Sequence, residues 1–184
     1  DEVQLALDEI KSFSDTPEKI DLLCIALAEL PPLVPLHILS VVAEINEQRI
    51  KSFINDLKYP LRISDDGVQF RDEPVETWFR NNFNAKHENF EKFVSILSEK
   101  SVNDPYVATT FPRLLFTVKR YDELVALSLG DNLDFDDPLI KRETFKNRIE
   151  YSLKACLVTK KYDLACKLLF RFSEEVETTS RQSK

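Results

Sequence analysis

The spacing of apolar residues changes along the chain and divides its first 83 residues into helices, a short hairpin and a further helix. Pro17 follows Thr16, an arrangement typical of a helix start with a capping hydroxyl. Residues 61–63 and 68–70 instead alternate apolar and polar positions, which predicts two short strands. Apolar residues recur at helical spacing in residues 3–13, 17–30, 36–45 and 47–57.

A tight turn is expected between the two strands, in residues 64–67 (SDDG). Asp-Gly flanked by alternating residues is the strongest short-range signal for a hairpin, because glycine reaches the positive φ that such turns need. We therefore expect Asp66 and Gly67 to form the turn. Residues 72–83 follow as a helix whose acidic first turn suits the helix dipole. Three helices, a two-stranded wing and another helix follow the element order of a winged helix.

The second half of the chain contains a repeat with a period of 41 residues. KRYD at 119–122 recurs as KKYD at 160–163, and each copy lies between two apolar helical segments. This pattern predicts two helical hairpins whose apolar faces need neighbours, as in an α-solenoid. We therefore expect a mainly α fold: the end of a preceding domain or a linker in 1–16, a winged-helix domain in 17–83, and TPR-like helical repeats in 84–184.

Composition excludes several classes of function. The 184 residues include 2 Gly, Gly67 and Gly130, so neither a GxxxxGK[ST] phosphate loop nor a GxGxxG dinucleotide loop can be written. The formal net charge of −7 lowers the expectation of nucleic-acid binding, because an acidic chain repels phosphate. No apolar run reaches the roughly 18 residues of a membrane span. The chain has no Met, so we expect a fragment or a processed product.

Histidine, cysteine and aspartate form no recognisable catalytic or metal-binding set. His37 and His87 have no partner at ligand spacing, so we expect core or surface histidines. The Asp-rich loop at 131–137 lacks the central glycine and the final glutamate of a calcium loop, and no metal site is predicted. Without CxxC spacing, the 3 cysteines are expected to be buried small hydrophobes in a reducing, cytoplasmic setting. They are Cys24, Cys156 and Cys166.

One alternative function is DNA binding by a winged-helix transcriptional regulator with a helical dimerisation or ligand domain. The third helix of such a domain reads DNA, and here it carries Arg49 and Lys51, with Lys58 directly after it. The acidic residues interleaved with them are Glu44, Glu47 and Asp56. The formal charge over 44–58 is therefore zero, whereas a DNA-reading surface normally shows a basic stripe. We do not expect nucleic acid as the partner.

The run ISDDGVQFRDEPVETWFR, followed directly by helical repeats, resembles the STAND class of P-loop ATPases. This class of signal-transduction ATPases includes NACHT and NB-ARC proteins, and the resemblance points to its prokaryotic antiviral-sensor type. The winged helix of that class ends in a Met-His-Asp-like motif whose histidine contacts the phosphate of bound ADP. Phe70-Arg71-Asp72 occupies the matching position, with Arg71 in place of histidine. A guanidinium also pairs with phosphate, so the resemblance implies nucleotide sensing by Arg71 and Asp72.

The resemblance implies a non-catalytic regulatory and interaction fragment that couples an absent ATPase domain to a repeat sensor. This chain would hold no cofactor itself, whereas its parent would use ATP or ADP with Mg. Expected partners are the upstream ATPase domain and a protein trigger or oligomer partner. Two plainer interpretations stand beside it. In one, Phe70 is a core residue, Arg71 is exposed and Asp72 only caps the next helix. In the other, the chain is a purely structural helical scaffold for protein partners, which is preferred if residues 61–70 are helical rather than a hairpin.

Overall fold

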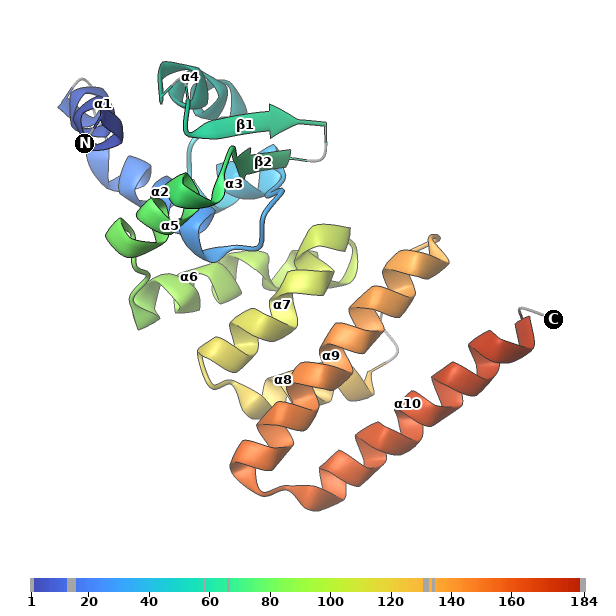
Figure 1. Cartoon of the computed structure of the whole chain (residues 1–184). Helices are drawn as coiled ribbons and strands as arrows, with labels where there is room; N and C mark the ends of the chain where they lie inside the picture. Colours follow the sequence, from blue (N-terminus) through green and yellow to red (C-terminus); the bar gives the residue numbers. More distant parts are fainter. Residues whose placement is uncertain are drawn as a thin grey trace. The chain divides into compact units, whose positions relative to one another are not determined.

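The fold is mainly helical, with one two-stranded antiparallel sheet among the described residues (Figure 1). It divides into two compact units, Asp1–Ile96 and Leu97–Lys184. The division between them therefore lies within the segment predicted to hold the repeats. The computed structural model describes residues 2–12, 16–57, 59–65, 67–130, 133 and 135–182.

The first unit follows the predicted order of helices, hairpin and helix. The hairpin lies between α4 and α5, with strands at Leu61–Ser64 and Gly67–Phe70, so the helical segment that would have favoured a purely structural scaffold is not found here. The elements are α1 (Glu2–Ser12), α2 (Pro17–Glu29), α3 (Leu36–Ala43), α4 (Glu47–Leu57), β1 (Leu61–Ser64), β2 (Gly67–Phe70), α5 (Glu73–Asn82) and α6 (His87–Leu97).

Local sequence explains several helix starts in this unit. Pro17 is the first residue of α2, as predicted. Thr16 precedes it, but its side chain makes no capping hydrogen bond, because φ −142° and ψ 66° lie outside the extended conformation of an effective cap. Asn46 does cap α4, since its Oδ1 accepts a hydrogen bond from the backbone N of Arg49 at 2.8 Å.

One residue joins the α2–α3 connection to the hairpin. Pro31 and Pro32 lack the N–H that would extend α2, and Leu33 then takes a positive φ of 65°. The chain turns so that Val34 exchanges two backbone hydrogen bonds with Val68, at 3.0 and 2.8 Å. Both valines are fully buried. The two-stranded sheet thus gains a third strand position that the sequence pattern did not predict.

Gly67 begins β2 and is held close to this third strand position. It pairs with Ser64 across the hairpin and has a φ of 145°, which side chains rarely adopt. A Cβ atom at this position would lie 2.6 Å from the carbonyl oxygens of Leu33 and Val34. Both the backbone conformation and the available space therefore require glycine. Asp66, expected beside it in the turn, lies outside the described residues.

An aromatic cluster packs α5 against the hairpin. Phe79 is fully buried, and its ring centroid lies 5.0 Å from that of Phe70, 5.3 Å from Trp78 and 5.5 Å from Phe83. Aromatic pairs at these separations stabilise a core beyond the area they bury. The cluster therefore fixes the point at which β2 turns into α5.

Helix α6 is attached to the first unit by polar contacts. The Lys92 Nζ donates to Glu44 Oε1 at 2.7 Å, and the backbone N of Ala85 donates to Glu29 Oε1 at 3.3 Å. The hydrogen bond and charge of Lys92 lower the pKa of the Glu44 carboxyl. These contacts connect residues beyond 83 to α2 and to the end of α3.

The second unit consists of helices that stack one on another. Aspartates begin two of them: Asp104 caps α7 through the N of Val107, and Asp137 caps α9 through the N of Leu139. In Figure 1 α9 (orange) lies between α7 and α8 on one side and α10 (red) on the other. The elements are the 3-10 helix η1 (Ser98–Val102), α7 (Pro105–Thr117), α8 (Tyr121–Leu129), α9 (Pro138–Thr159) and α10 (Tyr162–Gln182).

The two repeats of the sequence fold into corners of the same geometry. Lys119 between α7 and α8 has a φ of 64°, and Lys160 between α9 and α10 has a φ of 58°. In each corner the following residue donates its backbone N–H to the carbonyl five residues earlier, at 2.9 Å, from Arg120 and from Lys161. Gly130 then ends α8.

The second unit also contains a buried polar cluster between α8 and α9. The hydroxyls of Ser128 and Ser152 lie 2.6 Å apart, and both also reach the carbonyl of Leu124 at 3.0 Å. Arg148, almost completely buried, donates to the carbonyl of Ser101 at 3.2 Å. Burial, with the nearby charge of Arg171, lowers the pKa of Arg148 to about 10. Buried polar groups of this kind favour one register of α9 over others.

Replacing Gly67 by alanine should destabilise the first unit. We expect Gly67→Ala to lower the free energy of unfolding by about 2–3 kcal/mol, because the added Cβ meets two carbonyl oxygens at a strained φ. Urea denaturation followed by circular dichroism measures the change. Gly130→Ala is the matched control, since Gly130 has an ordinary φ of −82°, and should stay within about 0.5 kcal/mol of the wild type. Equal stability of the two variants would contradict the constraint.

Candidate functional site

The base of the hairpin brings together the residues that the sequence singled out on the family resemblance. Arg71 is exposed, and its Nε donates to the carbonyl of Leu61 at 3.2 Å. Its guanidinium carbon lies 5.8 Å from the centre of the Tyr59 ring. Among the described residues we find no partner for its two terminal nitrogens. The side chain of Arg71 is therefore oriented by the hydrogen bond from its Nε and by the Tyr59 ring, and its terminal nitrogens are accessible to an anion.

Asp72 uses both carboxylate oxygens within the protein. Its Oδ1 accepts from the N of Val75 at 3.0 Å, which caps α5, and its Oδ2 accepts from the hydroxyl of Tyr59 at 2.8 Å. The backbone N–H of Val75, followed by the Tyr59 hydroxyl, lowers the pKa of the Asp72 carboxyl. The same hydrogen bond raises the pKa of Tyr59. Asp72 is therefore a capping residue, as the plainer interpretation of this corner expects.

Tyr59 is the residue of this site that sequence reasoning missed. It contacts both Arg71 and Asp72, from the segment just before β1. No pattern around Tyr59 indicates that role, because its partners are brought to it only when the hairpin closes. We call Tyr59, Arg71 and Asp72 the wing-base site.

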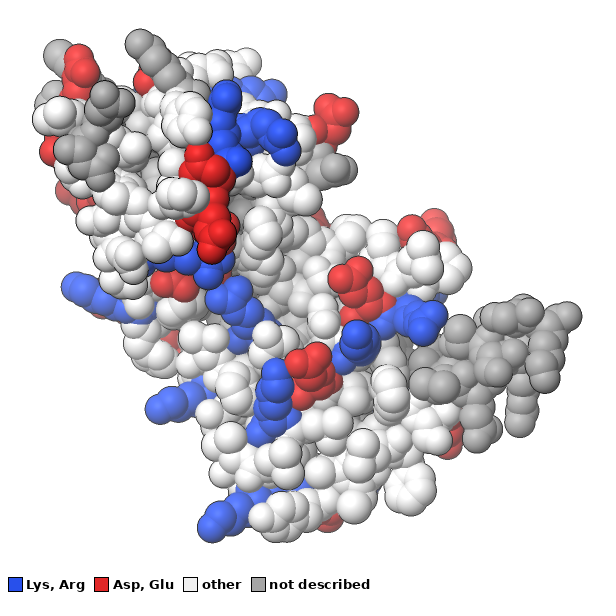
Figure 2. Space-filling view, viewed as in Figure 1, with Lys and Arg blue, Asp and Glu red and all other residues white. Residues whose placement is uncertain are grey.

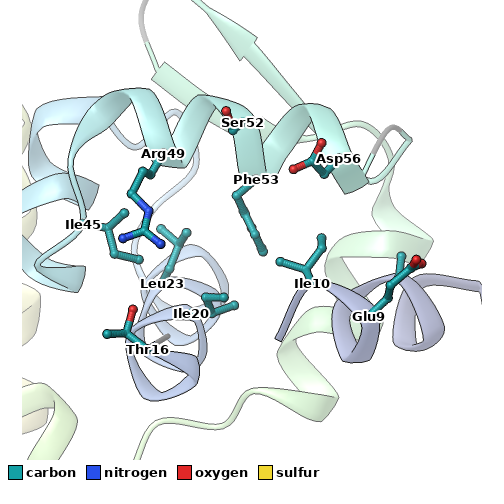
Figure 3. Close-up of a pocket in the computed structure, with 11 residues that line it drawn as sticks. Glu9, Ile10, Thr16, Ile20, Leu23, Ile45, Arg49, Ser52, Phe53 and Asp56 are labelled. Atoms are coloured by element: carbon teal, nitrogen blue, oxygen red, sulfur yellow. The ribbon is translucent and has the colours of Figure 1, made fainter. Parts of the chain in front are cut away.

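A second candidate site is a cavity of about 600 Å³ within the first unit. Figure 3 shows Arg49 and Phe53 directed into it from α4, and Ile10 and Glu9 approaching from α1. Arg49 is exposed, and we find no ion pair of its side chain among the described residues. The lining residues are Ala6, Glu9, Ile10, Thr16, Ile20, Leu23, Ile45, Arg49, Ser52, Phe53 and Asp56. The charged side chains of this lining are the guanidinium of Arg49 and the carboxylates of Glu9 and Asp56, around an otherwise mainly apolar floor.

The surroundings of α4 do not resemble a DNA-reading surface. Helix α1 packs against α4, and Glu9 and Asp56 line the same cavity as Arg49. Lys51 is exposed on α4, whereas Lys58 lies outside the described residues. On the face shown in Figure 2, basic side chains are interspersed with acidic ones among the residues described. The basic residues of α4 therefore lie close to carboxylates and do not form an uninterrupted basic stripe.

Cysteines and histidines of the described segments form no metal site. Among those residues no group of three or more His, Cys, Asp or Glu side chains is arranged to hold a metal ion. His37 and His87 are both exposed. Cys24 and Cys156 are buried, but Cys166 is exposed, so the expectation of three buried cysteines is wrong for Cys166. It lies on the side of α10 that no described helix covers.

Other regions contribute little to a site. Asp131 and Asp134 of the acidic loop lie outside the described residues, and Asp137 is occupied as the cap of α9. Within the described part of the chain, every helix is too short or too polar to cross a bilayer.

The cap at Asp72 should make the first unit sensitive to acid. The carboxyl has a lowered pKa in the folded state, so its contribution is present above its ordinary pKa of about 4 and is lost as the pH falls through the lowered value. In Asp72→Asn the thermal midpoint should therefore fall less steeply between about pH 5 and pH 2. Asp56→Asn, which removes an exposed carboxylate without a hydrogen bond among the described residues, should keep the wild-type slope. Parallel profiles for all three proteins would contradict the assignment.

Comparison with known proteins provides no relative from which a function could be transferred. A scan against protein-family models found no match, and a search of curated proteins found none either. The function proposed for this chain therefore rests on its residues and their geometry.

Proposed function

We propose that residues 17–83 form a winged-helix domain and that the second unit is a pair of TPR-like helical repeats, which together make a non-catalytic regulatory and interaction module. The bridge between Val34 and Val68 is the observation that best supports a winged-helix domain. A winged helix has a strand between its first and second helices, paired with the second strand of the wing. Val34, between α2 and α3, occupies that position and pairs with β2.

The repeat geometry supports the second part of the proposal. Both corners contain a lysine with positive φ, at positions 119 and 160, and equivalent backbone hydrogen bonds follow each of them. Helix α9 packs on the α7–α8 hairpin and α10 packs on α9. The first helical hairpin thus buries an apolar face against the second, which is how solenoid repeats gain stability.

For the regulatory role we propose the arrangement of a STAND-type signalling ATPase of the antiviral-sensor kind. The wing-base site would contact ADP held by an ATPase domain located N-terminal to this chain in a longer parent. Arg71 supports this because it is exposed, held at Nε by Leu61, and free of described partners at its terminal nitrogens. Those two nitrogens can pair with two phosphate oxygens at once. Asp72 and Tyr59 would fix the backbone that presents Arg71.

Under this proposal the module works as a two-state switch. ADP contacts made by Arg71 favour a closed state, and binding of a protein trigger to the repeat unit favours an open, oligomerising state. ATP or ADP with Mg would bind to the ATPase domain of the parent, and this chain would contribute only the sensing contact. The parent would act in the cytoplasm.

The nucleotide contact can be tested in the full gene product. A GxxxxGK[ST] phosphate loop is expected N-terminal to residue 1, and Arg71→Ala should shorten ADP retention at least tenfold, because a charge-assisted bidentate contact is lost. Release of labelled ADP on a nitrocellulose filter measures the retention time. Arg62→Ala, which removes another exposed arginine of the hairpin, is the control and should retain ADP like the wild type. A parent without a phosphate loop, or unchanged retention in Arg71→Ala, would reject the proposal.

DNA binding by the alternative winged-helix regulator can be tested with the chain itself. Fluorescence anisotropy with random-sequence duplex DNA in about 0.15 M salt should show binding no tighter than about 100 µM, in the range of non-specific contacts. The reason is the neutral charge balance of residues 44–58 and the carboxylates beside Arg49. Submicromolar, salt-dependent binding that is lost in Arg49→Ala and Lys51→Ala would instead establish the alternative.

A further inference from the structure

We infer that the cavity between α1, α2 and α4 binds a short apolar peptide with free ends, held by Arg49 at its carboxylate and by Asp56 at its ammonium group. The cavity has a volume of about 600 Å³, which is within the range of small-ligand sites. This inference goes beyond the proposed function, because it involves neither the wing-base site nor the helical repeats.

The cavity has an apolar floor and a charged rim. Its lining includes Leu23 of α2, which is fully buried, and Phe53 of α4, which is 6% exposed. Ile10 of α1, also part of the lining, is half-buried. Arg49 and Asp56 are exposed at the rim. A ligand bound here therefore buries an apolar part while its charged groups stay near water, which keeps the cost of desolvating those charges low.

Helix geometry sets the distance between the two charges of α4. Arg49 and Asp56 are seven residues apart, so they lie about 10.5 Å apart along the helix axis and within about 20° of the same face. Figure 3 shows Arg49 at one end of the cavity and Asp56 at the other, with Phe53 between them. In the part of the chain that the structure describes, neither side chain has an ion-pair partner. The rim therefore offers a cation and an anion to one ligand at a defined separation.

A further carboxylate excludes a simple anion as the ligand. Glu9 of α1 lines the cavity at the same end as Asp56. The charged side chains of the described lining are thus one arginine and two carboxylates, and their formal charges sum to −1. A fatty acid or a similar anion would be repelled by this balance. The cavity instead favours a ligand that brings a cationic group to the acidic end and an anionic group to Arg49.

The separation of the charges matches a peptide of three residues. An extended chain spans about 3.3–3.6 Å per residue, so the ends of a tripeptide lie about 10 Å apart. The hydroxyl of Ser52, which precedes Phe53 on α4 and lines the cavity, offers a hydrogen bond to a peptide group. A hydrocarbon chain with charged ends would leave that hydroxyl unused. A short apolar peptide therefore matches the cavity in charge, length and hydrogen bonding.

Isothermal titration calorimetry of the full chain with leucyl-alanyl-leucine tests the inference. The free tripeptide should bind with a Kd of about 10–100 µM, the range expected for a ligand of its size. The matched controls are the same peptide with an acetylated amino end and the same peptide with an amidated carboxyl end. Each should bind about threefold to tenfold more weakly, because each loses one charged contact at an exposed rim.

Variants of the chain assign each end of the peptide to its partner. In Arg49→Gln the free and the amidated peptides should bind equally, because the partner of the carboxylate has been removed. In Asp56→Asn the difference between the free and the acetylated peptides should shrink for the same reason. Lys51→Gln changes an exposed residue of α4 outside the described lining, so it is the matched control and should bind all three peptides as the wild type does.

Three results would overturn the inference. No binding of the free tripeptide up to about 1 mM would show that the cavity is not a peptide site. Equal binding of the free and the two blocked peptides would show that the ends are not recognised and that an internal segment of a protein chain is the better occupant. Equal effects of Arg49→Gln and Lys51→Gln would place the peptide elsewhere. None of these results bears on ADP retention in Arg71→Ala, so the inference and the proposed function fail separately.

Discussion

The pairing of Val34 with Val68 is the contact on which the first unit depends. A two-stranded hairpin is only marginally stable alone, and this pairing attaches it to the buried connection between α2 and α3. The approach is possible because Gly67 has no side chain to meet the carbonyls of the neighbouring segment. Once the hairpin is attached, its base is fixed, and the backbone that carries Arg71 has a defined position.

Much of the fold could be predicted from local sequence, because its helices bury regular apolar stripes and its hairpin has a strong turn signal. The predicted strands and the two repeat hairpins are present at nearly the predicted residues. The third strand position could not be predicted in this way. A bridge at one residue, Val34, has no period to detect, and it forms only when a distant hairpin meets it.

The residues of the candidate sites were likewise predictable only where the signal is local in sequence. Arg71 and Asp72 were found because the motif is local, and the role of Asp72 as a cap follows from its position before a helix. Tyr59 joins them through contacts made on folding, which no spacing rule encodes. Arg49 was considered as a DNA contact from its place on α4, yet its surroundings depend on α1, which is distant in sequence. Cys166 is exposed for a related reason, since the burial of a helix face depends on whether another helix covers it.

The ion pair between the corners gives the repeat unit a direction. Lys161 reaches back to Asp122, so the second hairpin contributes a base to the first, and Asp163 occupies in the second hairpin the position that Asp122 has in the first. The two ends of such a stack are therefore chemically different.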